Sequence, residues 1–146
     1  MKKYKKPSKL PKKKKISKLA KQKNNVSSRY WLKQADKLWS EIIRLHGKCD
    51  ICNSVDNLNA HHLLDRSIKK FRHEIICGVC VCAKCHKYSR HLSAHKSGVA
   101  FAYWLSINKP DQYKWVIEHY MEEDNLEPNY KEAFDNLKRI LDNKKE

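Results

Sequence analysis

Two closely spaced pairs of cysteines constrain this chain more than any other feature. Cys49 and Cys52 are separated by two residues, and so are Cys82 and Cys85. A pair at this spacing closes a tight turn that directs both sulfur atoms at one point, so two pairs supply the four thiolates of a tetrahedral zinc site. The spacing therefore predicts a structural Zn²⁺ that joins two segments far apart in the sequence.

A second pairing stays open, because Cys77 and Cys80 are also separated by two residues. The later pair is favoured, since "GVCVC" alternates like a strand that leads into a metal-binding turn and "HKYSRH" continues helically after it. Cys77 is then a loop residue and Cys80 a small buried side chain. Metal ligation, rather than disulfide bonding, is the expected use of cysteine in an intracellular protein.

Charge is distributed unevenly along the 146 residues, whose formal net charge is +16. Residues 1–25 contain twelve lysines and no acidic residue, so we expect a disordered arm that suits a polyanion such as nucleic acid. Residues 26–109 are also basic, whereas residues 110–146 are acidic. Neither a signal peptide nor a membrane span is expected, because no apolar segment is long enough. A soluble intracellular protein is the expectation.

The expected elements form a small α+β domain over residues 26–109. An amphipathic helix follows Ser28 and ends at Gly47, and we assign its Trp39 to the core alone. The segments "DNLNAHHLL" and "GVCVC" predict the two arms of a hairpin, joined by the basic loop "DRSIKKFRHEII". A short helix begins after the second arm. Three more helical stretches follow Gly98, and residues 110–146 are expected to pack as an extension on the same domain.

Three histidines lie where these elements would meet. His61 and His62 are neighbours on the first arm, and alternation along a strand points them to opposite faces. His86 follows the second cysteine pair directly. Two strands and a helix can bring such positions together around one ion, which predicts a second metal site beside the cysteine site.

The combination of C-x2-C, AHHLL and C-x2-C-H resembles the HNH, or ββα-metal (His-Me finger), nuclease superfamily in its zinc-supported form. The stretch from about Leu38 to Leu105 is similar to NinG-type recombination endonucleases of phages. The resemblance implies a ββα-metal nucleus with flanking helices, and a metal-dependent enzyme that hydrolyses phosphodiester bonds in duplex, nicked or branched DNA. It also implies phage recombination or repair in the bacterial cytoplasm, with a second copy of the chain or phage recombination proteins as partners.

Carried over by position, the resemblance makes His62 the general base and makes His61 and His86 ligands of a catalytic divalent metal, which could be Mg²⁺, Mn²⁺, Ni²⁺ or Zn²⁺. The reaction needs a base that deprotonates water near neutral pH and a cation that neutralises charge on the phosphate. An imidazole suits the first task. The expected products carry 5′-phosphate and 3′-hydroxyl ends.

The chain departs from the family pattern at two positions. The middle Asn of the family, nine residues before the helix histidine, corresponds to Cys77, which puts the rigidity of the loop between the strands in doubt. The third metal ligand of many relatives, four residues after that histidine, corresponds to Arg90. We favour His95 as the third ligand, and His91 is the alternative.

Basic residues near the proposed site are expected to hold flanking phosphates. They are Arg66, Lys69, Lys70, Arg72 and Lys87. Two other interpretations stay open. One is a non-catalytic zinc-knuckle protein that binds nucleic acid, which leaves the spacing of the histidines unexplained. The other is a thiol redox or metal-sensing module that uses Cys77 and Cys80, for which the sequence has no oxidoreductase motif.

Overall fold

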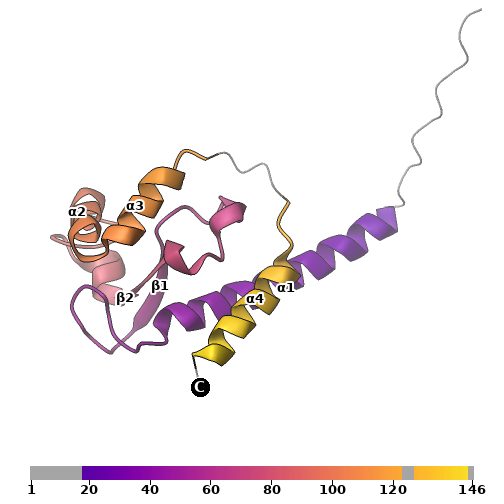
Figure 1. Ribbon diagram of the computed structural model, residues 1–146, viewed down its shortest axis with the longest axis horizontal. Coiled ribbons are helices and arrows are strands. Elements are labelled where there is room, and N and C mark those ends of the chain that lie inside the picture. The colour runs from indigo at the N-terminus through magenta and orange to yellow at the C-terminus, as the bar shows by residue number, and fades with distance from the viewer. Residues whose placement is uncertain (1–17, 123–126, 145–146) are drawn as a thin grey trace, which may run out of the picture.

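The computed structural model describes residues 18–122 and 127–144, and the side chains from Ser28 onward within these ranges. It is a mixed α+β fold, as predicted, with a two-stranded sheet among helices (Figure 1). Within these residues, no helix combines the length and the apolar character needed to cross a membrane. The elements in order are α1 (Lys18–Arg44), β1 (Leu58–His62), β2 (Gly78–Cys82), α2 (Gly98–Asn108), α3 (Pro110–His119) and α4 (Tyr130–Asn143).

Helix α1 begins earlier than predicted. The sequence suggested a disordered arm up to residue 25, but α1 already begins at Lys18 and continues to Arg44. The segment from Lys18 to Ser28 lacks glycine and proline and contains good helix formers, so a helix anchored further along extends through it at low cost. The rest of the expected arm, residues 1–17, lies outside the described residues. Helix α1 ends as predicted, because Gly47 adopts the left-handed conformation with φ of 74°.

The two strands are antiparallel and expose different side chains on their two faces. Residues paired across the sheet share a face, so His62 and its partner Gly78 lie on one face, and His61 and its partner Val79 lie on the other. Helix α1 covers the first face, and α2 covers the second. The residues buried at the first face are Ala35, Trp39, Ile42, Ile43, Cys80, Leu137 and Leu141. A second cluster contains Val79 and Val81 of the other face together with Cys49, Cys82, Cys85, Phe101 and Leu105.

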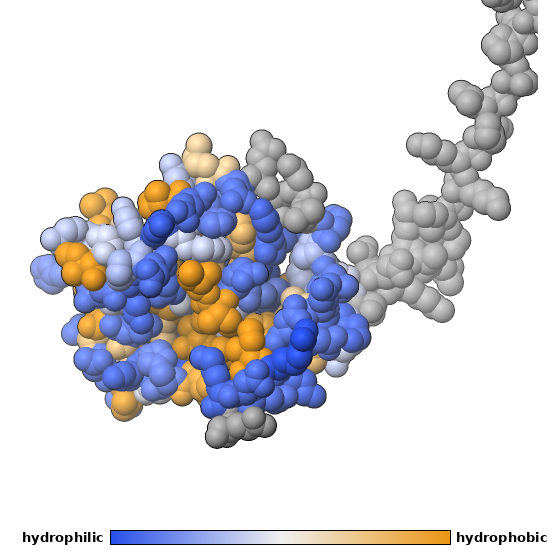
Figure 2. All heavy atoms as spheres, viewed as in Figure 1, coloured by the Kyte–Doolittle hydropathy of each residue, from blue (hydrophilic) through white to orange (hydrophobic). Residues whose placement is uncertain are grey.

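The two C-terminal helices contribute to the same cores. Leu137 and Leu141 of α4 pack against α1. Trp115 and Val116 of α3 pack against a third cluster, in the loop between the strands, to which Phe71 belongs. On the face drawn in Figure 2, apolar side chains gather in the middle, over the region of the sheet, α1 and α4, and polar side chains surround them. Helices α3 and α4 of the acidic C-terminal third therefore pack against the rest of the domain.

Gly78 allows the close approach of α1 to the sheet. A methyl group at this position would lie 2.4 Å from Cδ1 of Ile43 and 2.7 Å from Cζ2 of Trp39. The end of Ile43 can rotate away, but the indole ring is confined by its neighbours. We expect Gly78→Ala to lower the free energy of unfolding by about 1–3 kcal/mol, as overpacking does, measured by chemical denaturation.

Gly98→Ala is the matched control, because a Cβ there meets no atom within 4 Å. Its free energy of unfolding should stay within about 0.5 kcal/mol of the wild type. Equal stability of the two variants would contradict the packing described for α1.

Candidate metal centres and catalytic site

Four cysteine sulfurs converge beside one end of the sheet, from the two pairs that the sequence favoured. Cys49 and Cys52 lie in the turn before β1, whereas Cys82 ends β2 and Cys85 lies just after it. The four sulfur atoms lie within 4.8 Å of one another, and those of Cys52 and Cys82 are 3.6 Å apart. Sulfurs bound to one tetrahedral Zn²⁺ at about 2.3 Å lie about 3.8 Å from each other. The cluster is therefore compatible with a structural zinc site.

Asp50 joins the first cysteine turn to β2. Its backbone N–H donates to the carbonyl of Cys80 at 2.8 Å, and its carboxylate accepts the N–H of Cys80, also at 2.8 Å. Lys109 donates to the same carboxylate at 2.8 Å. The turn that carries Cys49 and Cys52 is thus held against the strand that carries Cys82 by main-chain and charged contacts.

The pKa values of Cys82 and Cys85 shift in opposite directions. Burial and the neighbouring sulfurs raise the pKa of Cys85. Burial also acts to raise the pKa of Cys82, but hydrogen bonds from the backbone of Cys85 and from neighbouring thiols lower it overall. The protein therefore favours ionisation of Cys82 and opposes that of Cys85, and a bound divalent cation would offset the cost of ionising the thiols.

The alternative cysteine pair is not brought together with this cluster. Cys80 is buried on the α1 face of the sheet, and Cys77 is buried in the loop cluster around Phe71. Burial raises the pKa of Cys80 to about 11 and also raises the pKa of Cys77. Buried thiols with raised pKa values are poor nucleophiles, so these positions do not favour a thiol redox module.

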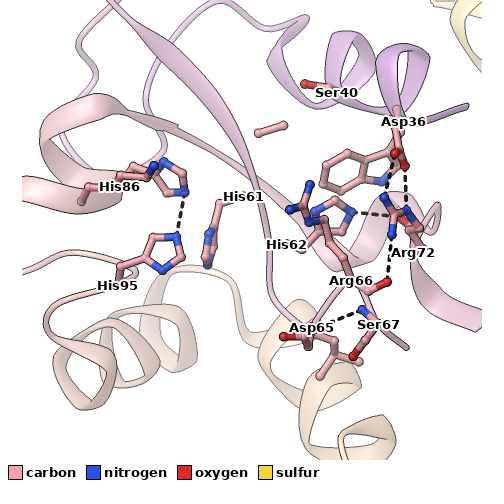
Figure 3. A pocket seen from close by; sticks show the side chains of 14 residues that line it. Asp36, Ser40, His61, His62, Asp65, Arg66, Ser67, Arg72, His86 and His95 are labelled. Atoms are coloured by element: carbon pink, nitrogen blue, oxygen red, sulfur yellow. Dashed lines mark hydrogen bonds and ion pairs between the residues drawn. The ribbon is translucent and has the colours of Figure 1, made fainter. Parts of the chain in front are cut away.

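Three histidines converge on the α2 side of the sheet. The ring nitrogens of His61, His86 and His95 lie within 4.8 Å of one another, and those of His86 and His95 are 3.1 Å apart (Figure 3). Nitrogens bound to one ion at about 2.1 Å are separated by about 3–3.4 Å, so the rings fit a shared metal. Of the two candidates for the third position, the structure brings in His95 and not His91.

The backbone explains why His95 takes this position. The helix expected after Cys85 is only one π-helical turn, Lys84–Tyr88, so Arg90 lies beyond it. The chain then turns back, and the N–H groups of Ala94 and His95 donate to the carbonyls of Cys85 and His86 at 3.0 and 3.2 Å. Arg90, four residues after His86, therefore does not lie on the same helical face as His86. His95, nine residues after His86, lies beside it instead.

Burial disfavours the protonated forms of two of the three clustered histidines. Burial, followed by the charges of His86 and His95, lowers the pKa of His61 to about 3. Burial likewise lowers the pKa of His86. No carboxylate belongs to the cluster among the residues that the structure describes. Imidazole donors suit Zn²⁺, Ni²⁺ and other transition metals better than the hard, oxygen-seeking Mg²⁺.

His62 projects from the opposite face of β1 (Figure 3). Its ring stacks on Trp39 with centroids 3.7 Å apart and planes 15° apart, and its Nε2 lies 2.9 Å from the carbonyl oxygen of Arg72. A carbonyl only accepts hydrogen bonds, so Nε2 carries the hydrogen and Nδ1 keeps its lone pair. Burial lowers the pKa of His62, which keeps the ring neutral near pH 7.

A cavity of about 890 Å³ is lined by both His62 and the histidine cluster. Arg66, Arg72 and Lys87, three of the five basic residues singled out in the sequence, also line it. The guanidinium group of Arg72 binds the carboxylate of Asp36 through two hydrogen bonds of 2.8 and 2.7 Å.

The two remaining basic residues lie outside this cavity lining and contact the acidic C-terminal third. Lys70 forms an ion pair with Glu122, and Nζ of Lys69 lies 4.0 Å from a carboxylate oxygen of Glu127. Phosphate binding at these two lysines would have to compete with those carboxylates.

The sequence analysis missed two residues that contact this region. Trp39 is a core residue, as expected, but it also forms the surface on which His62 stacks. Asp36 was not singled out, although it binds Arg72. The only sequence signal for Asp36 is an acidic residue at the border of the apolar face of α1, which by itself is common on solvated helices.

We expect the purified protein to contain one tightly bound zinc ion, and Cys82→Ser to lose it together with thermal stability. The reason is that loss of one thiolate opens the tetrahedral site. Metal analysis and thermal unfolding measure both effects. Cys80→Ala is the control, since Cys80 is equally buried but lies outside the cluster. Zinc lost from Cys80→Ala and retained in Cys82→Ser would indicate the alternative cysteine pair.

A second expectation separates His95 from His91. His95→Ala should weaken the binding of Ni²⁺ or Zn²⁺ at the histidine cluster by at least about tenfold, because one of three donors is removed. His91→Ala, in the same loop but outside the cluster, should leave the affinity unchanged. Titration calorimetry on protein already loaded with structural zinc measures both. An equal loss in the two variants would argue against the His95 geometry.

No family model matches the chain, and neither a curated protein nor a solved structure does. The function proposed for the protein therefore rests on the geometry of the two clusters and of His62.

Proposed function

We propose that this protein is a metal-dependent DNA endonuclease of the HNH, or ββα-metal, type. One observation carries the proposal. His62 has an unprotonated Nδ1 on one face of β1, the three-histidine cluster lies on the other face, and both line one cavity. A base and a cation site that flank the same space are what hydrolysis of a phosphodiester requires.

The proposed nucleus consists of β1, β2 and the π-helical turn Lys84–Tyr88, which takes the place of the helix in the ββα-metal arrangement. The cysteine cluster beside it would hold the structural zinc. Cys77 stands where the family has Asn, and its position supports a braced loop. Its carbonyl accepts the N–H of Leu63 at 2.8 Å, and its side chain is buried in the loop cluster with Leu64 and Phe71.

The protein's own residues would divide the reaction as follows. His62 Nδ1 accepts a proton from water, whose oxygen attacks the phosphorus while the bond to the 3′ oxygen breaks. The leaving 3′ oxygen takes a proton from solvent water, so the products are a 5′-phosphate and a 3′-hydroxyl. A divalent cation held by His61, His86 and His95 would supply charge neutralisation on the phosphate and on the leaving oxygen.

Charge supports DNA as the substrate. Arg66 and Lys87 line the cavity, four residues after His62 and directly after His86, and are suited to flanking phosphates. The chain as a whole carries a net charge of +16, which favours salt-dependent association with a polyanion. The resemblance noted in the sequence is the basis for proposing a role in phage recombination or repair, within the bacterial host cell.

Nicking of supercoiled plasmid in the presence of Ni²⁺, Mn²⁺, Zn²⁺ or Mg²⁺ tests the proposal. We expect the wild-type protein to cleave, with transition metals more effective than Mg²⁺ because of the imidazole donors. His62→Ala should reduce the cleavage rate about 10²–10⁴-fold, the usual contribution of a general base, with DNA affinity retained. His91→Ala is the control and should cleave at the wild-type rate.

Two outcomes would oppose the proposal in different ways. Unchanged cleavage by His62→Ala would remove His62 as the base. Wild-type protein that binds DNA but cleaves none under any metal would favour the non-catalytic zinc-knuckle interpretation.

A further inference from the structure

We infer that Asp36 and Trp39 of α1 are positioning residues for His62, an inference that rests on the proposed role of His62 as the base. The two residues are three positions apart and so lie on the same side of the helix. Two groups fix the imidazole ring. One is a carbonyl oxygen at its Nε2, which Asp36 anchors indirectly, and the other is the indole of Trp39, which lies against the face of the ring.

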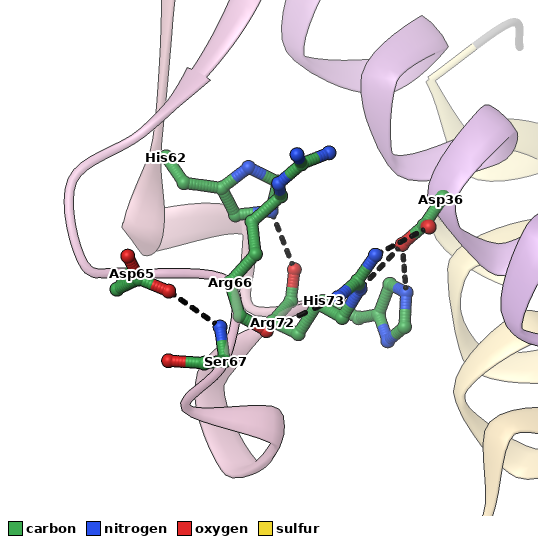
Figure 4. A network of polar contacts seen from close by, with 7 residues as sticks. All are labelled: Asp36, His62, Asp65, Arg66, Ser67, Arg72 and His73. Carbon is green, nitrogen blue, oxygen red and sulfur yellow. Dashed lines mark hydrogen bonds and ion pairs between the residues drawn. The ribbon is translucent and has the colours of Figure 1, made fainter.

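The first of these groups is the carbonyl of Arg72, and the side chain of the same residue anchors it. Arg72 donates from Nε to one carboxylate oxygen of Asp36 at 2.8 Å and from Nη2 to the other at 2.7 Å (Figure 4). Its Nη1 donates to the carbonyl of Arg66 at 3.1 Å. A bidentate pair fixes both distance and orientation, so the carbonyl that contacts His62 is tied to α1.

Asp36 is suited to this task because it stays ionised. Burial acts to raise its pKa, but hydrogen bonds from Arg72 and His73 and the charges of both residues keep the pKa well below its usual range. His73 Nε2 lies 3.0 Å from the same carboxylate. One acidic side chain of α1 therefore binds two consecutive residues of the loop.

Trp39 supplies the second group. It is 2% exposed and stacks on the His62 ring, so it limits rotation of the imidazole. Its Nε1–H donates to the carbonyl of Glu74 at 3.0 Å, two residues beyond Arg72. Helix α1 thus holds the loop on both sides of His73 while it also contacts the ring directly.

The loop needs this support because the sheet does not provide it. Between β1 and β2 the chain forms only two short 3₁₀ turns, Lys69–Phe71 and Ile75–Cys77. Arg72 lies between these turns, outside the strand ladder. Without the contacts to α1, its carbonyl could move, and His62 could adopt the other tautomer, in which Nδ1 carries the hydrogen and accepts no proton.

The test compares Asp36→Asn with Glu41→Gln, which makes the same chemical change at an exposed position of α1. NMR of protein with ¹⁵N-labelled histidine, recorded at one fixed pH, reports the tautomer of His62 without any substrate. We expect the Nε2–H tautomer in the wild type and in Glu41→Gln. Asp36→Asn should give a mixture of tautomers.

Cleavage measurements complete the test. Asp36→Asn should lower the single-turnover rate roughly 10–100-fold, with zinc content and DNA affinity unchanged. In a His62→Ala background the same substitution should have no further effect on residual cleavage, because the group that it positions is absent. Should Asp36→Asn not fold, Arg72→Lys replaces it, since lysine keeps the charge but cannot bridge Asp36 and the Arg66 carbonyl.

The outcomes separate this inference from the proposed function. A pure Nε2–H tautomer of His62 in Asp36→Asn, or an equal rate loss with and without His62, would overturn the positioning role. A wild-type protein that shows the expected tautomers but cleaves no DNA would overturn the nuclease function instead.

Discussion

The contact between α1 and the two-stranded sheet is the interaction on which the rest of the structure depends. A sheet of two strands is marginally stable in water, so its faces must be covered by other elements. Here Trp39 and Ile43 of α1 approach the sheet closely because Gly78 has no side chain. The indole that fills this space is also the surface against which His62 stacks. His62 is the residue that pairs with Gly78 on the neighbouring strand. Core packing and the orientation of the proposed base are consequences of the same contact.

The two ligand clusters depend on the same short segments. Cys82 ends β2, and Cys85 and His86 are adjacent residues in the turn that follows it. The sulfur cluster therefore lies one peptide bond from the histidine cluster. The return of residues 94 and 95, hydrogen-bonded to the carbonyls of Cys85 and His86, completes the second cluster from a segment that is itself irregular. Fixing the cysteine turn thus also fixes the base of the histidine site.

Local patterns in the sequence predicted the parts of the molecule that short-range chemistry determines. The cysteine spacing identified the four sulfurs, and strand alternation placed His61 and His62 on opposite faces. The sequence left His91 and His95 open, because the choice depends on where a single π-helical turn ends. Arg72 was assigned to phosphate, yet its partner is Asp36, on a helix far away in the sequence. Such a pair has no periodicity and no fixed spacing, so only the folded chain reveals it.

His61 and His62 point to opposite faces of the sheet, so the position of each histidine depends on the register of the two strands. A tight hairpin turn would set the register by its own geometry, but β1 and β2 are joined by a long loop. A slip of one residue would exchange the faces, bringing His62 among the nitrogen donors and turning His61 toward Trp39. The sulfurs of the cysteines that precede β1 and end β2 converge in the observed pairing of Leu58 with Cys82, so the same slip would also displace these sulfurs relative to one another. Convergence of the four sulfurs and separation of the two histidines therefore depend on one and the same strand pairing.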